Sequence, residues 1–351
     1  MMRTSFHKED VILLLKDITG LVEPEPAKVR ERRIQSGVHY SEMLPQEYRP
    51  TEKYMREYEN ALHVYARQTA EAVCSVAELL YNRMGRELVL VSLARSGIPV
   101  GVLIKRYLKK KYGLDCPHYG ISIIRGRGID KNAMDFILER HPAHCIQFVD
   151  GWTGKGAILK TLAEALGDYP QVSSELAVLA DPARLTELCG THEDFLIPSS
   201  CLNATISGLV SRTFLRGDII GPKDFHGAHY YGELADEDET YRFIETVEAF
   251  FDWNLPPKEP GVDPAYTGMD EVKKIAADFG VKDINLVKPG VGETTRVLLR
   301  RVPRCVLVND PAKMEDITHI RRLAQEREVP IIAYPLKIYR TCGVITELAD
   351  V

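Results

Sequence analysis

The chain of 351 residues lacks several features that would define its class at once. No apolar run is long enough to cross a membrane, and the charged N-terminus has no signal-peptide core. The seven cysteines are scattered and form no Cys-x-x-Cys pair, which argues against a zinc ribbon or a disulfide framework and favours a reducing cytoplasm. The formal net charge of -5 gives no overall sign of a nucleic-acid partner. We therefore expect a cytoplasmic protein without membrane contact.

The order of the apolar segments predicts the fold class. Runs typical of buried strands alternate with segments of helical period, which indicates an α/β fold with a mostly parallel sheet and helices on both faces. The expected strands are Leu88–Leu93, Gly120–Ile124, Cys145–Val149, Leu176–Ala180 and Phe195–Ile197. The expected helices are Thr51–Arg83, Ile98–Lys110, Asn132–Arg140, Ala157–Leu166 and Glu239–Phe251.

A proline-rich segment, Leu255–Pro264, interrupts this pattern, and the α/β alternation restarts after it. We predict a first domain over residues 1–254, a linker over 255–264 and a smaller α/β domain over 265–351. The second domain is less acidic than the first, which is a hint of an RNA partner.

Two loops that follow expected strands carry arginine and glycine. The first offers Arg95, Ser96 and Gly97, and the second, with the sequence RGRG, offers Arg125 and Arg127. Ligands of open α/β sheets bind at the carboxyl ends of the strands, where such residues suit a pyrophosphate and its developing charge. The alternative is that Arg95 caps a helix and that the other two arginines are solvated surface charges.

A third loop, Asp150–Gly156, follows the strand Cys145–Val149. Its glycines and the helix behind them suit a phosphate group, while Asp150 suits sugar hydroxyls or a metal ion. The alternative is a plain strand–turn–helix unit in which Asp150 is a helix cap.

The residues Val149, Asp150, Thr153, Gly154 and Lys155 resemble the motif of PRPP-binding phosphoribosyltransferases. The resemblance implies that Asp150 binds the ribose and the Mg2+ that accompanies PRPP, and that the turn cradles the 5′-phosphate. Gly151 stands where the family has a second acid. The implied ligand-binding residues are Ser96, Gly97, Asp150, Gly151, Thr153, Gly154, Lys155 and Gly156, with Arg95, Arg125 and Arg127 as catalytic residues.

A cysteine and a histidine downstream form a second candidate site. Cys201 lies among small and hydroxyl residues, and His226 follows in the segment Lys223–Gly232. A neighbouring imidazole lowers the pKa of a thiol and so favours a thiolate nucleophile. The alternative is a buried structural cysteine in a segment that covers the ligand.

Most of residues 36–232 resemble the StiP-type family. The resemblance is carried by the segments HYSEMLP, ARSGIPVG, VDGWTGKG, SSCLNATISGL and DFHGAHY. It implies a phosphoribosyltransferase-like core and a part in tellurite-type stress responses, in which members make or process a nucleoside-like metabolite. Some members are labelled cysteine proteases, and for that activity Cys201 and His226 are the pair to test.

The segment after the linker resembles the pelota-type and ribosomal kink-turn RNA-binding domains. Gly290, Gly292, Glu293 and Arg296 are similar to the motif Gly-x-Asn-Glu-x-x-Lys, with Gly292 in place of Asn and Arg296 in place of Lys. Arg300 lies four residues after Arg296, so both belong to one basic helix face that suits RNA phosphates. The alternative is a basic face that meets only solvent.

Three functional hypotheses follow. The leading one is a phosphoribosyltransferase-like enzyme that uses PRPP, or a related phosphorylated sugar or nucleotide, with Mg2+. The second is a cysteine hydrolase or protease with Cys201 and His226. The third is a non-catalytic ribose-phosphate sensor coupled to RNA binding, which Gly151 favours. The sequence leaves the acceptor, the RNA target and the formation of a homodimer open.

Overall fold

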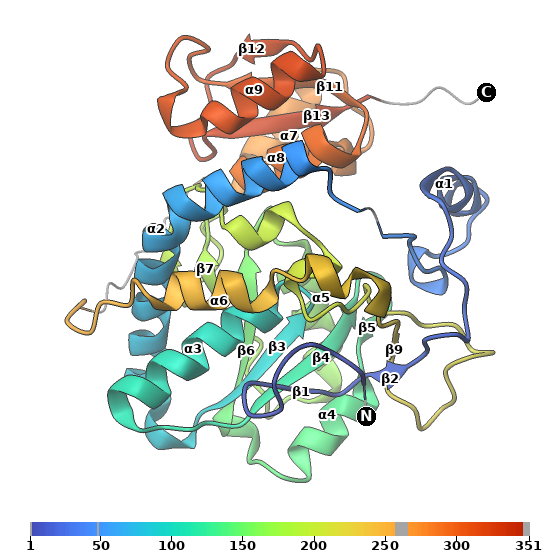
Figure 1. Cartoon of the computed structure of the whole chain (residues 1–351), viewed down its shortest axis with the longest axis vertical. Helices are drawn as coiled ribbons and strands as arrows, with labels where there is room; N and C mark the ends of the chain where they lie inside the picture. The colour runs from blue at the N-terminus through green and yellow to red at the C-terminus, as the bar shows by residue number, and fades with distance from the viewer. Residues whose placement is uncertain (1, 48, 257–265, 347–351) are drawn as a thin grey trace.

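The computed structural model describes residues 2–47, 49–256 and 266–346. It confirms a mixed α/β fold with a mostly parallel central sheet and a smaller C-terminal domain (Figure 1). The part of the predicted linker over 257–264 lies outside the described residues, and the domain boundaries stay a prediction. No helix among the described residues is long and apolar enough to span a membrane.

The central sheet positions the candidate site. Its strands have the spatial order β1-β4-β3-β6-β7-β8, all parallel, with β5 antiparallel beside β4. They are β1 Ile12–Leu13, β3 Val89–Ala94, β4 His118–Ile124, β5 Gly128–Ile129, β6 Ile146–Trp152, β7 Leu176–Ala180 and β8 Cys189–Thr191. From β3 the chain moves outward to β4 and then returns past β3 to β6. The loops after β3 and β6 therefore flank the switch point, where open α/β sheets bind ligands.

Helices cover both faces of this sheet. On one face lie α2 Glu52–Met84, α3 Gly97–Tyr112 and α6 Thr240–Glu248, and on the other lie α4 Lys131–Leu138 and α5 Ala157–Ala165. The helix α2 begins where the sequence predicts it, because the side chain of Thr51 accepts a hydrogen bond from the Tyr54 backbone N–H at 3.3 Å. The helix α1, Ala27–Gln35, and the strand pair β2 Lys16–Asp17 and β9 Gly227–Ala228 complete this part.

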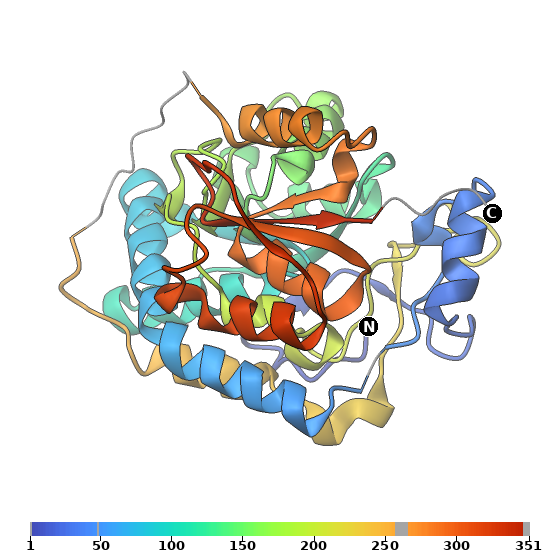
Figure 2. The same ribbon diagram turned by 90° about the horizontal axis from the view of Figure 1, so that it is seen from above.

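The C-terminal domain has a sheet of its own, with the strand order β10-β13-β11-β12. Its elements are α7 Gly268–Asp278, β10 Val287–Pro289, α8 Val291–Arg300, β11 Pro303–Val308, α9 Thr318–Glu326, β12 Ile331–Ala333 and β13 Thr341–Ile345. Apolar side chains of α8 and α9 share one core with those of α2. The helix α9 runs beside α2 (Figure 2), where Lys53 pairs with Glu326 at 2.8 Å. The domain is therefore fixed to the first domain by buried apolar surface.

One strand prediction is wrong. The segment Phe195–Ile197 is buried but belongs to no strand, and the last strand of the sheet is β8. The reason is close packing: a Cβ on Gly190 would lie 2.5 Å from the Ala72 carbonyl oxygen, so β8 fits against α2 because it carries a glycine. A short strand with a central glycine has no apolar period to reveal it.

The start of α3 provides a test of the fold. A Cβ on Gly97 would lie 2.3 Å from the Val149 carbonyl oxygen, whereas one on Gly167 meets nothing within 4 Å. We expect Gly97→Ala to lower the free energy of unfolding by about 1–3 kcal/mol through overpacking of α3 on β6. Gly167→Ala is the matched control and should change it by less than about 0.5 kcal/mol. Urea unfolding measures both, and equal stability of the two variants would contradict the close approach.

Candidate functional site

The switch point joins the first and third predicted loops through one hydrogen bond. The hydroxyl of Ser96 donates to Asp150 Oδ1, which also accepts the Gly151 backbone N–H at 2.7 Å. Burial raises the pKa of Asp150 to about 6, although both donors favour the carboxylate. Gly97 serves the packing of α3 on β6 described above, so its glycine has a structural reason that needs no ligand.

The turn after β6 faces the C-terminal domain. Lys155 Nζ donates to the carbonyl oxygens of Ile284 at 2.6 Å and Val287 at 3.3 Å, and the Tyr339 hydroxyl donates to the Gly154 carbonyl oxygen at 2.6 Å. Two of the residues that the sequence predicts to hold a phosphate, Gly154 and Lys155, therefore contact the second domain.

The other members of this turn have local roles. The hydroxyl of Thr153 donates to Asp181 Oδ1, and Gly156 has a φ of 82° at the start of α5. That positive φ explains the glycine without a ligand.

Two of the three predicted catalytic arginines are held by acids. Arg95 pairs with Glu47 at 3.1 Å, with both side chains largely buried, and Arg127 pairs with Glu42. Arg125 is different, because its exposed guanidinium lies 5.8 Å from the centre of the Tyr40 ring. Of these three arginines, Arg125 is the one without a carboxylate partner among the residues that the structure describes.

Cys201 and His226 have different neighbours among the described residues. Cys201 belongs to the apolar core formed with α2, and its carbonyl oxygen accepts the Tyr54 hydroxyl. His226 Nδ1 lies 2.8 Å from Ser122 Oγ, and the His226 backbone N–H donates to Asp130. Burial lowers the pKa of His226. Their pairing stays a prediction.

A second cysteine–histidine contact is one that the sequence reasoning missed. Cys189 Sγ lies 3.8 Å from His192 Nδ1 and 3.9 Å from Nε2, and Nδ1 lies 2.7 Å from the Asp181 carbonyl oxygen. Burial raises the pKa of the Cys189 thiol to about 12. The side chains of Asp181, Cys189 and His192 place their ligand atoms within 4.8 Å of one another, so they are also a donor set that zinc accepts. Metal binding at Asp150 stays a prediction.

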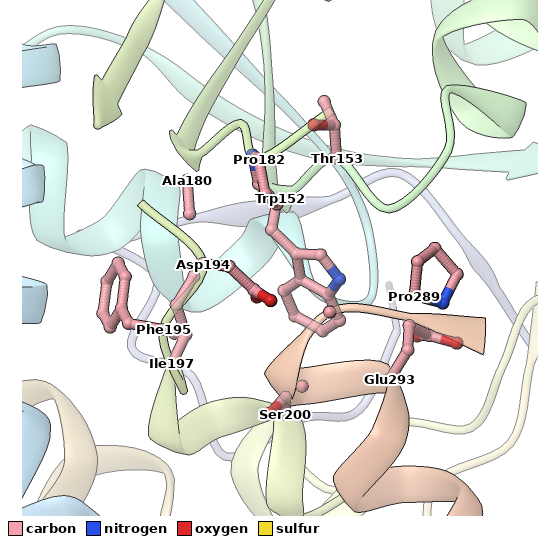
Figure 3. Close-up of a pocket in the computed structure, with 12 residues that line it drawn as sticks. Trp152, Thr153, Ala180, Pro182, Asp194, Phe195, Ile197, Ser200, Pro289 and Glu293 are labelled. Atoms are coloured by element: carbon pink, nitrogen blue, oxygen red, sulfur yellow. The ribbon is translucent and has the colours of Figure 1, made fainter. Parts of the chain in front are cut away.

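A narrow pocket lies between the two domains. Figure 3 shows the ring of Trp152 between Asp194 and Glu293, with Ser200 facing it from the turn Pro198–Cys201. Ser200 Oγ is buried and has no hydrogen-bond partner among the described residues. The pocket therefore combines two carboxylates with an unpaired hydroxyl.

Asp194 connects the two domains at this pocket. Its carboxylate accepts the backbone N–H groups of Val291 at 2.8 Å and Arg340 at 2.9 Å, and burial raises its pKa to about 6. The Val291 N–H belongs to the first turn of α8, so the carboxylate lies at the positive end of that helix. No pattern in the sequence indicated this residue.

The predicted RNA-binding residues divide into covered and open ones. A Cβ on Gly290 would lie 3.1 Å from Asp194 Oδ1, and one on Gly292 would lie 3.4 Å from Ser200 Oγ, so both glycines face the first domain. Arg296 pairs with Glu293 at 3.0 Å and is partly exposed. The side chain of Arg300 lies outside the described part of α8.

Fold and site together define an open α/β protein whose switch point is covered by a second α/β domain. A family model described as "Tellurite-like stress resistance cysteine protease StiP" matches residues 4–248, and one described as "PELOTA RNA binding domain" matches residues 266–347. A protein of Acinetobacter baylyi named "Cysteine protease StiP" is 36% identical over 98% of this chain and 94% of its own length. The chain belongs to the StiP family.

These comparisons contradict the leading functional hypothesis. The family and the relative are both described as cysteine proteases, whereas the sequence reasoning put a PRPP-dependent phosphoribosyltransferase first. They agree with the second hypothesis, a cysteine hydrolase, and so support an enzyme of a different class. The physical reason for the error lies in the turn after β6, where Lys155 and Gly154 bind the C-terminal domain.

Asp150 gives a pH-dependent test of the switch point. Because burial raises the pKa of Asp150 from its ordinary value of 3.8 to about 6, the free energy of unfolding falls as the pH rises between these two values and stays lowered above them. We expect Asp150→Asn, which keeps the acceptor for Ser96, to raise the free energy of unfolding by about 1–3 kcal/mol at pH 7.5 and by less at pH 5. Urea titrations at the two pH values measure the gain.

The exposed Asp168, which pairs with Lys131, supplies the control for this test. Asp168→Asn should change stability by less than about 0.5 kcal/mol at either pH. If Asp150→Asn is less stable than the wild type at pH 7.5, the expected gain is wrong, and the donors Ser96 and Gly151 require the negative charge of the Asp150 carboxylate.

Proposed function

We propose that the protein is a cysteine hydrolase of the protease type, with Cys189 as nucleophile, His192 as general base and Asp181 as the residue that orients the imidazole. The observation that carries the proposal is the contact of Cys189 Sγ with the His192 ring at 3.8–3.9 Å. A nucleophile within reach of a base that a third group orients is the arrangement such catalysis needs. The family description supports the same class of reaction.

The hydrogen bond to Asp181 assigns the single N–H of the neutral His192 imidazole to Nδ1. His192 Nδ1–H donates to the Asp181 carbonyl oxygen, which leaves the lone pair on Nε2 for the thiol proton. The thiol is protonated at neutral pH because burial raises its pKa to about 12. Nε2 therefore takes the proton as sulfur attacks the peptide carbonyl carbon. It then returns the proton to the leaving amine, and water hydrolyses the thioester.

The rate of alkylation distinguishes a nucleophilic Cys189 from a Cys189 that is only structural. All seven cysteines are buried, and Cys74 is a matched control because burial raises the pKa of its thiol to about 12 as well. With iodoacetamide at pH 7.5 and peptide mass spectrometry, we expect Cys189 to react about 10-fold faster than Cys74, since His192 accepts its proton. We expect His192→Gln to remove that difference.

Hydrolysis of fluorescein-labelled casein gives the second readout. We expect Cys189→Ser to lower the rate at least about 100-fold, while Cys201→Ser retains it. The reverse result would return the catalytic role to Cys201 and His226. Equal alkylation of Cys189 and Cys74 together with full activity of Cys189→Ser would refute the assignment.

We also propose that the C-terminal domain binds RNA. The match of residues 266–347 to the PELOTA RNA-binding model supports this proposal. Fluorescence anisotropy of a labelled 20-nucleotide single-stranded RNA, titrated with the full-length protein at 100 mM salt, tests it. Absence of a salt-sensitive rise in anisotropy would remove the proposal.

A further inference from the structure

Three side chains that can bind a metal ion meet at the edge of the central sheet opposite the switch point. Glu87 lies just before β3, and His144 and Cys145 lie just before β6. The strands β3 and β6 are parallel neighbours whose first residues, Val89 and Ile146, lie opposite each other. The pairing of the sheet therefore brings the two preceding turns together at the amino ends of the strands. We call Glu87, His144 and Cys145 the amino-edge trio.

The ligand atoms of the amino-edge trio are close enough to share one ion. A carboxylate oxygen, a ring nitrogen and the sulfur lie within 4.8 Å of one another. His144 Nε2 lies 3.4 Å from Glu87 Oε2, which is longer than a charge-assisted hydrogen bond of about 2.7–2.9 Å. Zinc bonds of about 2.0–2.2 Å at the tetrahedral angle place a nitrogen and an oxygen ligand about 3.3–3.6 Å apart. The observed separation therefore fits two ligands of one tetrahedral ion.

The donor atoms of the amino-edge trio are open to an ion from solvent. Within the described ranges 2–47, 49–256 and 266–346, these three side chains make one polar contact, that of His144 with Glu87. The side chains of Glu87 and His144 are 73% and 71% exposed, whereas Cys145 is 4% exposed. An ion can therefore enter between the two exposed ligands, and the buried sulfur forms the inner side of the site.

The other group with suitable ligand atoms, Asp181 with Cys189 and His192, has its acid occupied by protein donors. The Asp181 carboxylate accepts the backbone N–H groups of Leu185 at 2.6 Å and Thr186 at 2.8 Å. A metal ion there would displace donors from a buried carboxylate and leave them unpaired, which costs free energy. The amino-edge trio has no such donors to displace among the described residues.

We propose that the amino-edge trio is a zinc site, with Glu87, His144 and Cys145 as protein ligands and water in the fourth position. A thiolate together with an imidazole favours Zn2+ over Mg2+ and Ca2+, which prefer oxygen ligands. The thiol proton passes to solvent as the sulfur–zinc bond forms. The ion then joins the start of β3 to the start of β6. This site is separate from the proposed hydrolase and goes beyond it.

Cobalt tests the sulfur ligand directly. The full-length protein is freed of metal with EDTA, dialysed and titrated with Co2+, and Zn2+ is then added to displace the cobalt. A Co2+–thiolate bond gives charge-transfer absorption in the near ultraviolet, which a carboxylate or an imidazole ligand does not give. We expect a saturable band that Zn2+ removes. Absence of this band in the wild type would overturn the proposal.

Variants of the two cysteine-containing groups locate the ion. We expect Cys145→Ser to abolish the band and His144→Gln to weaken the affinity for Co2+ at least about 10-fold. Cys189→Ser is the matched control, because it removes the thiol of the other group, and it should keep both the band and the affinity. Loss of the band in Cys189→Ser with retention in Cys145→Ser would place the ion at the other group and overturn the proposal.

Stability supplies a readout that does not depend on cobalt. The folded sheet brings the ligands together, so Zn2+ should raise the urea midpoint of the wild type. His144→Gln changes an exposed side chain and serves as the folded variant where Cys145→Ser does not fold. It should lose the zinc-dependent shift, and a shift equal to that of the wild type would contradict the site. Casein hydrolysis by the zinc-free protein tests the hydrolase separately, so the two proposals fail independently.

Discussion

The Asp194 carboxylate holds the C-terminal domain against the carboxyl edge of the central sheet, and much of the remaining architecture follows from that contact. It accepts the backbone N–H groups of Val291 and Arg340. Val291 follows β10 and Arg340 precedes β13, and these two strands are neighbours in the sheet of the second domain. Two donors on one rigid acceptor fix an orientation, because both angles must be satisfied together. The apolar core shared by α2, α8 and α9 then supplies most of the driving force for docking.

This docking decides what the switch point can do. In an open α/β sheet the turns at the carboxyl ends of the strands that flank the switch point, here those after β3 and β6, are where ligands bind. Here Lys155 binds the carbonyl oxygens of Ile284 and Val287, and Tyr339 binds that of Gly154. A glycine-rich turn after a strand has the same sequence pattern whether it faces a phosphate or another domain. The sequence pattern alone therefore favoured a phosphoribosyltransferase.

The sequence was informative where local physics decides the outcome. The cap at Thr51 and the long apolar face behind it placed α2 within one residue, and four of the five expected strands are present. It failed where contacts distant in the chain decide. Nothing local marks Asp194 as a domain anchor. The contact of Cys189 with His192 did have a sequence signal, a Cys-x-x-His spacing at the end of β8. The sequence did not predict β8, because this strand depends on the fit of Gly190 against α2.

The junction also concentrates buried charge of both signs. Burial raises the pKa of Asp150 and Asp194 to about 6, and it lowers that of Lys155 to about 8. Opposite shifts have one cause, because loss of water penalises any charged form. The carboxylates recover part of this cost through N–H and hydroxyl donors. Burial also lowers the pKa of Lys288, and the charge of the neighbouring Glu293 opposes that shift.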